Sequence, residues 1–303
     1  MVTLRQLRYF AALADTRHFG RAASRCAITQ PALSMQIRDL EQALGVGLVE
    51  RRSAEIALTA VGSEVARRAE AILAEVRDLV EFAGAQKGVL CGSMRLGIIP
   101  SIAPYLLPAL LPRLNESYPG LDLHVRETQT MAIVEELVRG DLDGAVIALP
   151  WDHPQISALP LFEDEFLLAV GASDAARWSP GRMRSELQSA RLLLLEEGHC
   201  LRDQALQFCQ LADPAARRSL GATSLATIVQ MVAAGYGVTL LPRLCAEAEV
   251  RDDRVALLPF GDPAPARQIG LVWRTTSPRR ADVEALAEVI RATKLSRGSG
   301  RIV

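Results

Sequence analysis

The chain is poor in lysine and has no long hydrophobic run. Lysine occurs only at positions 87 and 294 of the 303 residues, so arginine supplies nearly all of the positive charge. Half of the residues are hydrophobic, yet no apolar run approaches the roughly 18 to 20 residues of a membrane-spanning helix. The opening MVTLRQLRYF is charged and amphipathic and lacks the pattern of a secretion signal. We therefore expect a cytoplasmic protein with no membrane partner.

A strong excess of positive charge is also missing. The formal net charge is −1, which argues against a protein that coats nucleic acid along its whole length. The first 62 residues differ, because their arginines at 5, 8, 17, 21, 25, 38, 51 and 52 outnumber the acids at 15, 39, 41, 50 and 55. This excess is compatible with a local basic surface, although an ordinary solvated surface gives the same count.

The five cysteines, at positions 26, 91, 200, 209 and 245, do not form an even set. An odd number in a reducing compartment argues against a structural disulfide framework. Most such cysteines are inert small hydrophobes, so the question is whether one of them is reactive. Cys200, Cys209 and His199 lack a fourth ligand at a usual spacing, and we expect no metal and no cofactor.

Three short helices are predicted at the N-terminus. Thr3 and Gln6 have the spacing of a capping box and begin the first helix. A second helix fits Gly20–Cys26, and Thr29 can cap a third helix. On the third helix, one apolar stripe consists of Leu33, Ile37, Leu40 and Leu44.

The outer face of the third helix suits contacts with DNA bases. Glutamine pairs with adenine edges, arginine with guanine or phosphate, and serine with either. A second helix that follows a tight turn and carries such side chains is typical of a helix-turn-helix. Any three-helix bundle shows a similar periodicity, so this pattern alone leaves both interpretations open. The predicted DNA-binding residues are Thr29, Gln30, Pro31, Ala32, Ser34, Met35 and Arg38, with Arg51 and Arg52 in a β-hairpin wing.

A longer helix with a different pattern begins at Thr59. Its apolar residues alternate between a and d positions of three heptads, which favours pairing with a second copy of the chain. Dimers fit DNA sites with two-fold symmetry. The alternative is an amphipathic helix that packs on its own chain. The predicted seam comprises Val65, Ala69, Ile72, Val76, Leu79 and Ala83, and residues 84–92 are interpreted as a hinge.

From Ser93 onward, strand-like runs alternate with helical stretches. This alternation predicts mostly parallel sheets covered by helices, and the length of the segment favours two lobes around a cleft. We expect strands at Met94–Ile99, Leu121–Glu127, Leu142–Leu149, 165–171, 191–196, 238–242, 255–260 and 268–274, and helices at Leu106–Ser117, Thr130–Gly140 and 279–293.

The N-terminal motif resembles that of LysR-type regulators. Residues 22–45 carry the pattern AAxxxxxTQPALSxQIxxLExxLG. The resemblance extends over the whole chain and implies an α/β protein with an all-α winged helix-turn-helix domain at 1–60. It further implies a dimerisation helix and hinge at 61–92 and a two-lobed effector domain at 93–303, similar to type 2 periplasmic binding proteins. Implied partners are double-stranded promoter DNA, RNA polymerase and further copies in a homodimer or homotetramer.

Within this family the chain is similar to the OxyR-like hydrogen peroxide sensors, which activate oxidative stress genes. Residues 198–209 read GHCLRDQALQFC, and 97–108, 223–242 and 269–274 also match. The resemblance implies that Cys200 reacts with peroxide and that Cys209 resolves the product into a disulfide, which cytosolic thiol reductants reverse. It places Ser101, Thr130, His199, Arg202 and Asp203 at the peroxide pocket.

The sequence departs from this subfamily at several positions. Residue 101 is usually threonine, and serine lacks the methyl group that would fix the rotamer of the hydroxyl. Arg52, Ala54 and Glu55 differ from the usual wing. Cys91 and Cys245 lie outside the sensor signature and are interpreted as bystanders.

The residue types around Cys200 suit peroxide chemistry. Only a thiolate attacks peroxide, so we expect a depressed pKa for Cys200. Cys200 follows the run RLLLLEE and should begin a helix, where free backbone N–H groups and the helix dipole favour an anion. Arg202 is expected to add positive charge, which Asp203 partly offsets. Ser101 or Thr130 could donate a hydrogen bond to the peroxide, and the product would be a sulfenic acid.

The spacing of the two cysteines predicts a conformational switch. An intact helix would hold Cys200 and Cys209 about 13 Å apart, whereas a disulfide needs Cα atoms within about 7 Å. The segment must therefore unwind or swing when the bond forms, and we expect that change to reposition the DNA-binding domains. Two other functions remain open: a LysR-type regulator with a small organic effector in the interlobe cleft, and a thiol-dependent enzyme that pairs a cysteine with a histidine.

Overall fold

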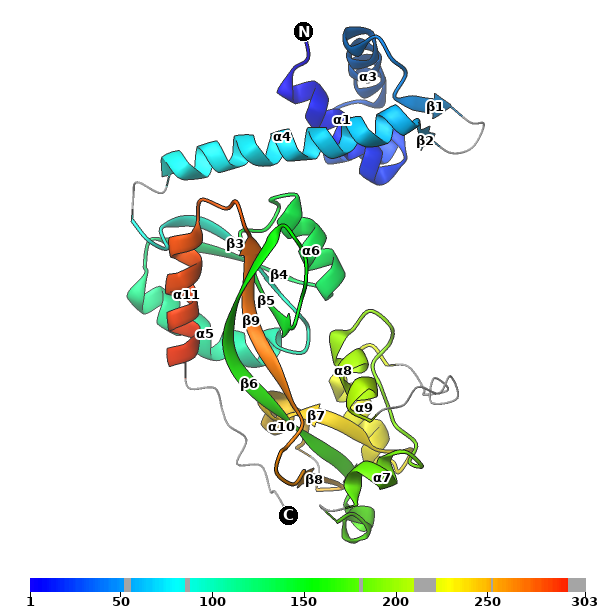
Figure 1. Cartoon of the computed structure of the whole chain (residues 1–303), viewed down its shortest axis with the longest axis vertical. Coiled ribbons are helices and arrows are strands. Elements are labelled where there is room, and N and C mark those ends of the chain that lie inside the picture. The colour runs from blue at the N-terminus through cyan, green and yellow to red at the C-terminus, as the bar shows by residue number, and fades with distance from the viewer. Residues whose placement is uncertain (52–55, 85–87, 180–181, 210–221, 252, 294–303) are drawn as a thin grey trace. The chain divides into compact units, whose positions relative to one another are not determined.

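The chain folds into two units that each have their own core. The computed structural model describes residues 1–51, 56–84, 88–179, 182–209, 222–251 and 253–293, and it divides into Met1–Gly84 and Ala85–Val303 (Figure 1). No helix within these ranges is long and apolar enough to cross a membrane. The two units are described separately below.

The N-terminal unit is helical, with one small hairpin. Its elements are α1 (Leu4–Thr16), α2 (Phe19–Arg25), α3 (Gln30–Leu44), β1 (Val49–Arg51), β2 (Ile56–Leu58) and α4 (Ala60–Gly84). The capping box is confirmed, since the Thr3 side chain accepts from the Gln6 backbone and the Gln6 side chain accepts from the Thr3 backbone. The Thr29 cap and the antiparallel hairpin are confirmed as well. The second helix begins and ends one residue earlier than predicted.

The core of the N-terminal unit comes from all of its helices. Phe10 and Leu13 of α1 pack with Leu33 and Leu40 of α3 and with Leu48, and all five are fully buried. Burial of a leucine or phenylalanine side chain contributes roughly 1.5–3 kcal/mol, so these side chains account for much of the stability of a small domain. On α3 the predicted stripe is buried except for Leu44, which is exposed at the C-terminal end of the helix.

The C-terminal unit is an α/β domain with two lobes. Its strands are β3 (Gly92–Ile98), β4 (Leu121–Glu127), β5 (Gly144–Leu149), β6 (Ile156–Gly171), β7 (Thr239–Pro242), β8 (Val255–Pro259) and β9 (Ala266–Arg274). Its helices are α5 (Ala103–Ser117), α6 (Thr130–Val138), the 3-10 helix η2 (Ala172–Arg177), α7 (Met183–Leu187), α8 (Cys200–Phe208), α9 (Leu225–Ala233), α10 (Arg243–Glu249) and α11 (Arg280–Ala292).

The sheet is mixed, and the expectation of mostly parallel sheets is wrong. Strands follow the order β4-β3-β5-β9-β6-β7, with β8 also paired to β6. Among the strands that the structure describes, the β3–β4 and β3–β5 pairs are parallel, whereas β9 runs antiparallel to β5 and β6, and β6 runs antiparallel to β7 and β8. The βα alternation predicts parallel neighbours only where a crossover helix returns to the same sheet, and β9 instead arrives from the second lobe.

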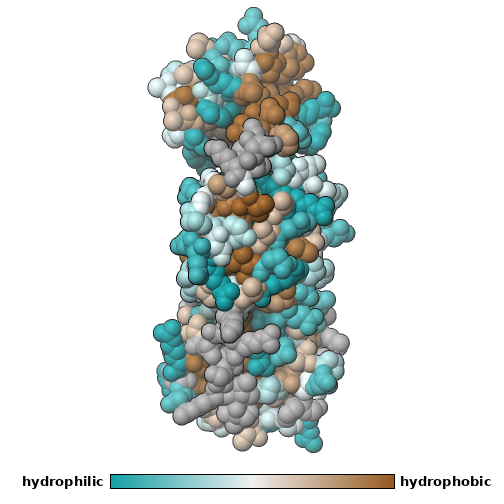
Figure 2. Space-filling view, turned by 90° about the vertical axis from the view of Figure 1, so that its left-hand side faces the viewer, coloured by the Kyte–Doolittle hydropathy of each residue, from teal (hydrophilic) through white to brown (hydrophobic). Residues whose placement is uncertain are grey.

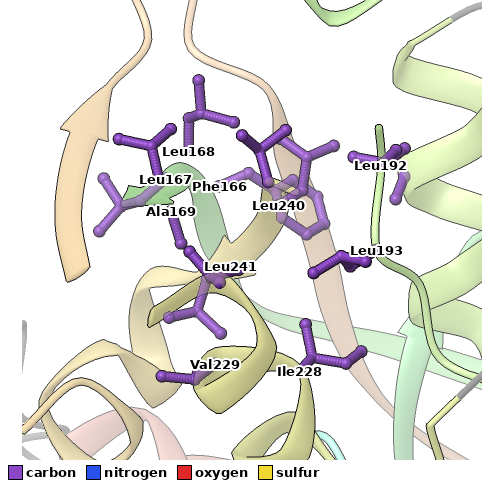
Figure 3. Packing of buried hydrophobic residues seen from close by; sticks show 14 of the residues in the cluster. Phe166, Leu167, Leu168, Ala169, Leu192, Leu193, Ile228, Val229, Leu240 and Leu241 are labelled. Carbon is purple, nitrogen blue, oxygen red and sulfur yellow. The ribbon is translucent and has the colours of Figure 1, made fainter. Parts of the chain in front are cut away.

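Two long strands connect the lobes. The first half of β6 pairs with β9, and its second half pairs with β7 and β8 (Figure 1). The first lobe has a core around β3, β5 and α5, and the second has a core in which Phe166 and Leu168 of β6 pack near Leu240 of β7 (Figure 3). The crossing therefore places residues 162–165 of β6 and the start of β9 between two separate cores.

The strand predicted at 191–196 is wrong. Leu192, Leu193, Leu194 and Leu195 are all buried, but the segment makes only isolated bridges, from Leu192 to Val238 and from Leu195 to Ala222. Four consecutive buried leucines indicate a segment covered on both sides, and this burial does not require a continuous ladder of strand hydrogen bonds.

The contact between α4 and the rest of the N-terminal unit gives a test of this packing. A Cβ atom added at Gly62 would lie 2.0 Å from the Leu48 backbone oxygen. Because backbone cannot move aside as a side chain can, we expect Gly62→Ala to lower the free energy of unfolding by about 1–3 kcal/mol or more. Thermal unfolding measures the loss. Gly47→Ala is the matched control, since nothing lies within 4 Å of its Cβ position, and equal melting temperatures for the two variants would contradict the packing.

Candidate functional site

The predicted DNA-reading residues lie on the outer side of α3. The Thr29 hydroxyl accepts from the Ala32 backbone N–H at 3.4 Å and so stabilises the helix start. Gln30, Pro31, Met35 and Arg38 are exposed, while Ala32 and Ser34 are half-buried. Arg51 lies in β1, and Arg52 lies outside the described residues. The structure thus brings the α3 residues onto one face, opposite the buried stripe.

The predicted seam on α4 divides into two parts. Val65 and Ala69 pack in the core of the N-terminal unit itself, as the alternative interpretation expected. Ile72 and Leu79 are exposed, Val76 is half-buried, and the side chain of Ala83 lies outside the described residues. Val80 and Phe82 are exposed nearby, and Figure 2 shows hydrophobic residues gathered on one face of this unit. The C-terminal half of α4 keeps the apolar surface that the dimer prediction needs.

Cys200 is the first residue of α8, as expected. His199 precedes it as the N-cap residue in extended conformation and provides no side-chain cap. The Leu201 backbone N–H and the Thr130 hydroxyl both favour the thiolate form of Cys200, and Thr130 and Cys200 line the same small cavity. The sulfur therefore occupies the position at a helix start where backbone donors are free.

A small cavity lies beside the Cys200 thiol. Its volume is ≈ 10 Å³, close to the space that about one water-sized molecule occupies. Gly198 adopts φ +91, and a Cβ there would lie 2.5 Å from Gln129 Oε1, so only glycine allows this close approach. The cavity is lined by Ile99, Pro100, Ser101, Gln129, Thr130, Gly198, His199, Cys200 and Leu201.

Arg267 supplies the positive charge at this site. Its side chain is fully buried and pairs with Asp164, with Nη2 2.8 Å from Asp164 Oδ2. It also donates to Ser101 Oγ at 2.8 Å and to the Ser101 carbonyl at 3.1 Å. The other Asp164 oxygen accepts from the Leu244 backbone at 2.9 Å, at the start of α10. One buried ion pair on the connecting strands thus contacts both lobes.

The expected depressed pKa of Cys200 is wrong for this conformation. Burial raises the pKa of the thiol above its ordinary value, because desolvation disfavours the thiolate. The charge of Arg267, the Thr130 hydroxyl and the Leu201 N–H lower the pKa, in that order, and Asp203 raises it slightly. Of the favourable groups that sequence reasoning expected, the Thr130 hydroxyl and the backbone N–H at the helix start are present, and burial outweighs them together with the charge of Arg267.

Three residues predicted to line the peroxide pocket, His199, Arg202 and Asp203, lie in different surroundings. His199 lines the cavity. Arg202 faces away from the thiol, since its guanidinium is buried and donates to the Leu195 carbonyl at 3.0 Å. The expectation that Arg202 adds charge beside Cys200 is therefore wrong, and Arg267 has that role. Asp203 is exposed and lines the larger interlobe cleft.

Cys209 is buried at the C-terminal end of α8. The helix is continuous from Cys200 through Phe208, and nine residues of helical rise correspond to about 13 Å. All five cysteines are among the described residues, and none of them forms a disulfide in this structure. Cys245 is fully buried, its sulfur donates to the Pro242 carbonyl, and burial raises its pKa. In the described part of the chain, no three potential ligands form a metal-binding group.

A larger cleft of ≈ 620 Å³ between the lobes is also lined in part by Cys200. It is lined by residues that include Thr130, Trp151, Gln204 and Arg267. Thr130 Oγ1, Trp151 Nε1 and Gln204 Oε1 are buried and have no conventional hydrogen-bond partner. Buried polar atoms are nearly always paired, so this cleft offers both donors and acceptors to a polar molecule.

Two family models match successive parts of the sequence. Residues 4–63 match the bacterial regulatory helix-turn-helix protein of the lysR family, and residues 87–294 match the LysR substrate binding domain. The chain belongs to the LysR family. Within that family it is of the OxyR type, as the relatives and solved structures indicate.

Curated relatives align over nearly the whole length. A probable hydrogen peroxide-inducible genes activator from Streptomyces viridosporus is 43% identical over 291 residues, covering 95% of this chain and 93% of the relative. The DNA-binding transcriptional dual regulator OxyR from Escherichia coli is 42% identical over 291 residues, covering 96% and 95%.

Solved structures of the same group share the fold. A full-length OxyR mutant from Pseudomonas aeruginosa has a TM-score of 0.77 at 34% identity and covers 100% of this chain and 99% of its own. A hydrogen peroxide-bound OxyR cysteine-to-serine mutant from Corynebacterium glutamicum has a TM-score of 0.66 at 34% identity, covering 97% and 93%. The winged helix-turn-helix and two-lobed α/β architecture expected from the sequence is therefore confirmed.

Sequence reasoning missed Arg267 and its partner Asp164. A signal for Arg267 was available in the alternation of β9. Residues 267, 269, 271 and 273 share one face of the strand, and the last three are apolar and buried. A charged residue at an inward position of such a strand needs a buried partner. The matching stretch that drew attention began two residues later, at Ile269.

The role of Arg267 can be tested through the pH dependence of thiol reactivity. Arg267→Gln removes the largest influence that lowers the pKa of Cys200, so its pKa should rise further. Because the thiolate forms only as pH passes through the pKa, the curve of iodoacetamide alkylation rate against pH should move to higher pH. We expect alkylation at neutral pH to slow several-fold.

The same variant should also lose stability, by about 3–5 kcal/mol, because Asp164 remains buried without its partner. Arg243→Gln is the matched control, since Arg243 pairs at 2.9 Å with the half-exposed Glu165 on the same strand as Asp164, and exposed pairs contribute about 0–1 kcal/mol. An alkylation profile that does not differ between the two variants would exclude Arg267 as the source of the charge.

Proposed function

We propose that this chain is a DNA-binding transcription regulator of the oxidative stress response, activated when hydrogen peroxide oxidises Cys200. The observation that carries the proposal is the Cys200 thiol at a helix start, beside a cavity for about one small molecule and a buried arginine. Its relatives are named for induction by hydrogen peroxide, which supports the same ligand. In this proposal promoter DNA, RNA polymerase and further copies of the chain are the macromolecular partners.

In the proposed reaction, two hydroxyl groups beside the cavity donate hydrogen bonds to the peroxide while Cys200 attacks it. The Cys200 thiol first releases its proton, and the thiolate attacks one peroxide oxygen, so that the S–O bond forms and the O–O bond breaks. The departing hydroxide takes up a proton equivalent to the one that the thiol released and becomes water. Ser101 Oγ accepts from Arg267, so its own proton is free to point into the cavity. This hydrogen bond also fixes the hydroxyl, a role that a threonine methyl would otherwise have. Thr130 supplies a second hydroxyl without another partner.

The second step forms the disulfide. The Cys209 thiol attacks the sulfenic sulfur of Cys200, the S–S bond forms, and water leaves. Since α8 separates the two residues by about 13 Å and a disulfide allows about 7 Å between Cα atoms, the helix must unwind. Leu201, Arg202 and Ala205 are buried with α8, so unwinding disturbs the second lobe. Thiol reductants would reverse the bond and restore the helix.

A small organic effector in the interlobe cleft is the second candidate function. The three unpaired polar atoms of Thr130, Trp151 and Gln204 favour it. An enzyme that uses Cys200 is less well supported, because the helix-turn-helix unit has no part in such a reaction. Repeated consumption of peroxide with an added reductant would favour the enzyme, and a Cys200 thiol that peroxide leaves unchanged would favour the effector.

The peroxide switch is tested by mass spectrometry of the reduced chain after brief exposure to a slight excess of peroxide. We expect a Cys200–Cys209 cross-link that Cys200→Ser abolishes. Cys209→Ser should stop at the sulfenic acid, which dimedone traps. Cys91→Ser is the control, because Cys91 lies far along the sequence from α8 and should leave the cross-link intact. A cross-link to Cys91 in place of Cys209 would rule out the proposed resolving step.

The DNA-binding face is tested at Arg38, which is exposed on the outer side of α3. Arg38→Ala should weaken operator binding by about 1–3 kcal/mol if the side chain contacts a base. Fluorescence anisotropy with labelled operator DNA at fixed salt measures the change. Arg280→Ala serves as control, since Arg280 is exposed on α11 in the C-terminal unit and pairs with the exposed Glu284 at 2.8 Å. Equal affinities for the two variants would remove Arg38 from the interface.

A further inference from the structure

Four buried or half-buried charges form a network in the first lobe that the peroxide site does not use. Arg279 Nε lies 2.7 Å from Asp282 Oδ2, and Arg279 Nη1 lies 3.5 Å from Asp143 Oδ2. Asp143 also pairs with Arg95 at 2.6 Å. The side chains of Asp143, Arg279 and Asp282 are at most 10% exposed. We refer to Arg95, Asp143, Arg279 and Asp282 as the anchor network.

The anchor network holds the backbone at the start of the C-terminal unit. The Leu90 N–H donates to Asp282 Oδ1 at 2.7 Å across 192 residues of sequence. The Ser93 carbonyl accepts from Arg279 Nη1, and the Arg95 N–H donates to Asp143 Oδ2 at 2.6 Å. Both α11 and the start of β5 therefore fix the segment that leads into β3, in addition to the sheet hydrogen bonds.

Leu90 itself has an unusual conformation. Its φ is +51, in the left-handed region that leucine rarely adopts, and its side chain is buried in the first-lobe core. A non-glycine residue keeps such a conformation only when its surroundings determine it. The Asp282 hydrogen bond on one side and the core on the other provide those surroundings. The chain direction at Leu90 is therefore fixed relative to the first lobe.

We propose that Asp282 and Arg279 are positioning residues that couple the C-terminal unit to the linker. Because Leu90 cannot turn independently of the first lobe, a rearrangement of this unit is passed on to the chain that leads to α4. Without the anchor, the chain could pivot at Leu90 and the rearrangement would be absorbed there. This inference rests on the proposed function, since the rearrangement in question is the one that follows the Cys200–Cys209 disulfide.

Two variants of the full-length chain test the coupling. Asp282→Asn keeps the shape but removes the charge and places an amide donor toward Arg279. Leu90→Gly leaves the network intact, removes the buried side chain and allows free rotation. Cross-linking of Cys200 to Cys209 is followed by mass spectrometry, and DNase footprints on operator DNA are recorded for the reduced and oxidised forms. Thermal unfolding shows whether each variant is folded.

We expect the wild type to change its footprint on oxidation. Both variants should form the cross-link at the wild-type rate and bind operator DNA, but their reduced and oxidised footprints should be the same. A purely structural role would instead alter cross-linking together with stability. Asp122→Asn is the matched control, because Asp122 is an exposed residue on β4, and it should behave as the wild type.

Three results would overturn the coupling. Variants whose footprints change with oxidation as in the wild type show that the anchor transmits nothing. Slower cross-linking in both variants assigns the network to general stability. A wild-type footprint that does not respond to a completed cross-link removes the transmission altogether. If the proposed function itself is wrong, the wild type forms no Cys200–Cys209 cross-link. This outcome is distinct from the three results that overturn the coupling alone.

Discussion

The geometry of α8 constrains the whole account. One continuous helix begins at Cys200 and ends beside Cys209, and its length keeps the two sulfurs in separate environments. Cys200 lines a small cavity, whereas Cys209 is buried in the core of the second lobe. A bond between them cannot form by side-chain rotation, because the helical rise exceeds the disulfide span by about a factor of two. Chemistry at one thiol is therefore tied to the loss of a folded element.

The Asp164–Arg267 pair places a balanced positive charge beside the buried Cys200 thiol. Burial raises the pKa of Cys200, and a thiol in a purely apolar site would be inert. Arg267 opposes this effect while its own charge is balanced by Asp164, and it also donates to the hydroxyl and the carbonyl of Ser101. The pair lies on β6 and β9, the two strands shared by the lobes, and Asp164 also holds the start of α10. The site is thus connected to both lobes through a single ion pair.

Local signals in the sequence predicted the local structure well. Caps at Thr3 and Thr29, the apolar stripe of α3 and the helix that begins at Cys200 depend on neighbours within a few residues, and the structure has all of them. Pairings between distant segments were not predictable in this way. The antiparallel course of β9, the direction of Arg202 toward Leu195 and the Arg267–Asp164 pair each depend on residues that the fold brings together. The pKa of Cys200 was misjudged for the same reason. Desolvation of the thiol depends on burial by distant segments, which the sequence of residues 199–203 does not show.

Hydrogen–deuterium exchange across residues 200–209 tests the central claim most directly. The reduced chain should protect the amides of this segment, because they donate within a helix whose inner face is buried. The chain carrying the Cys200–Cys209 cross-link should lose that protection, while α9 and β7 keep theirs. Equal protection of residues 200–209 in both forms would mean that the disulfide forms without unwinding α8, and it would contradict the account.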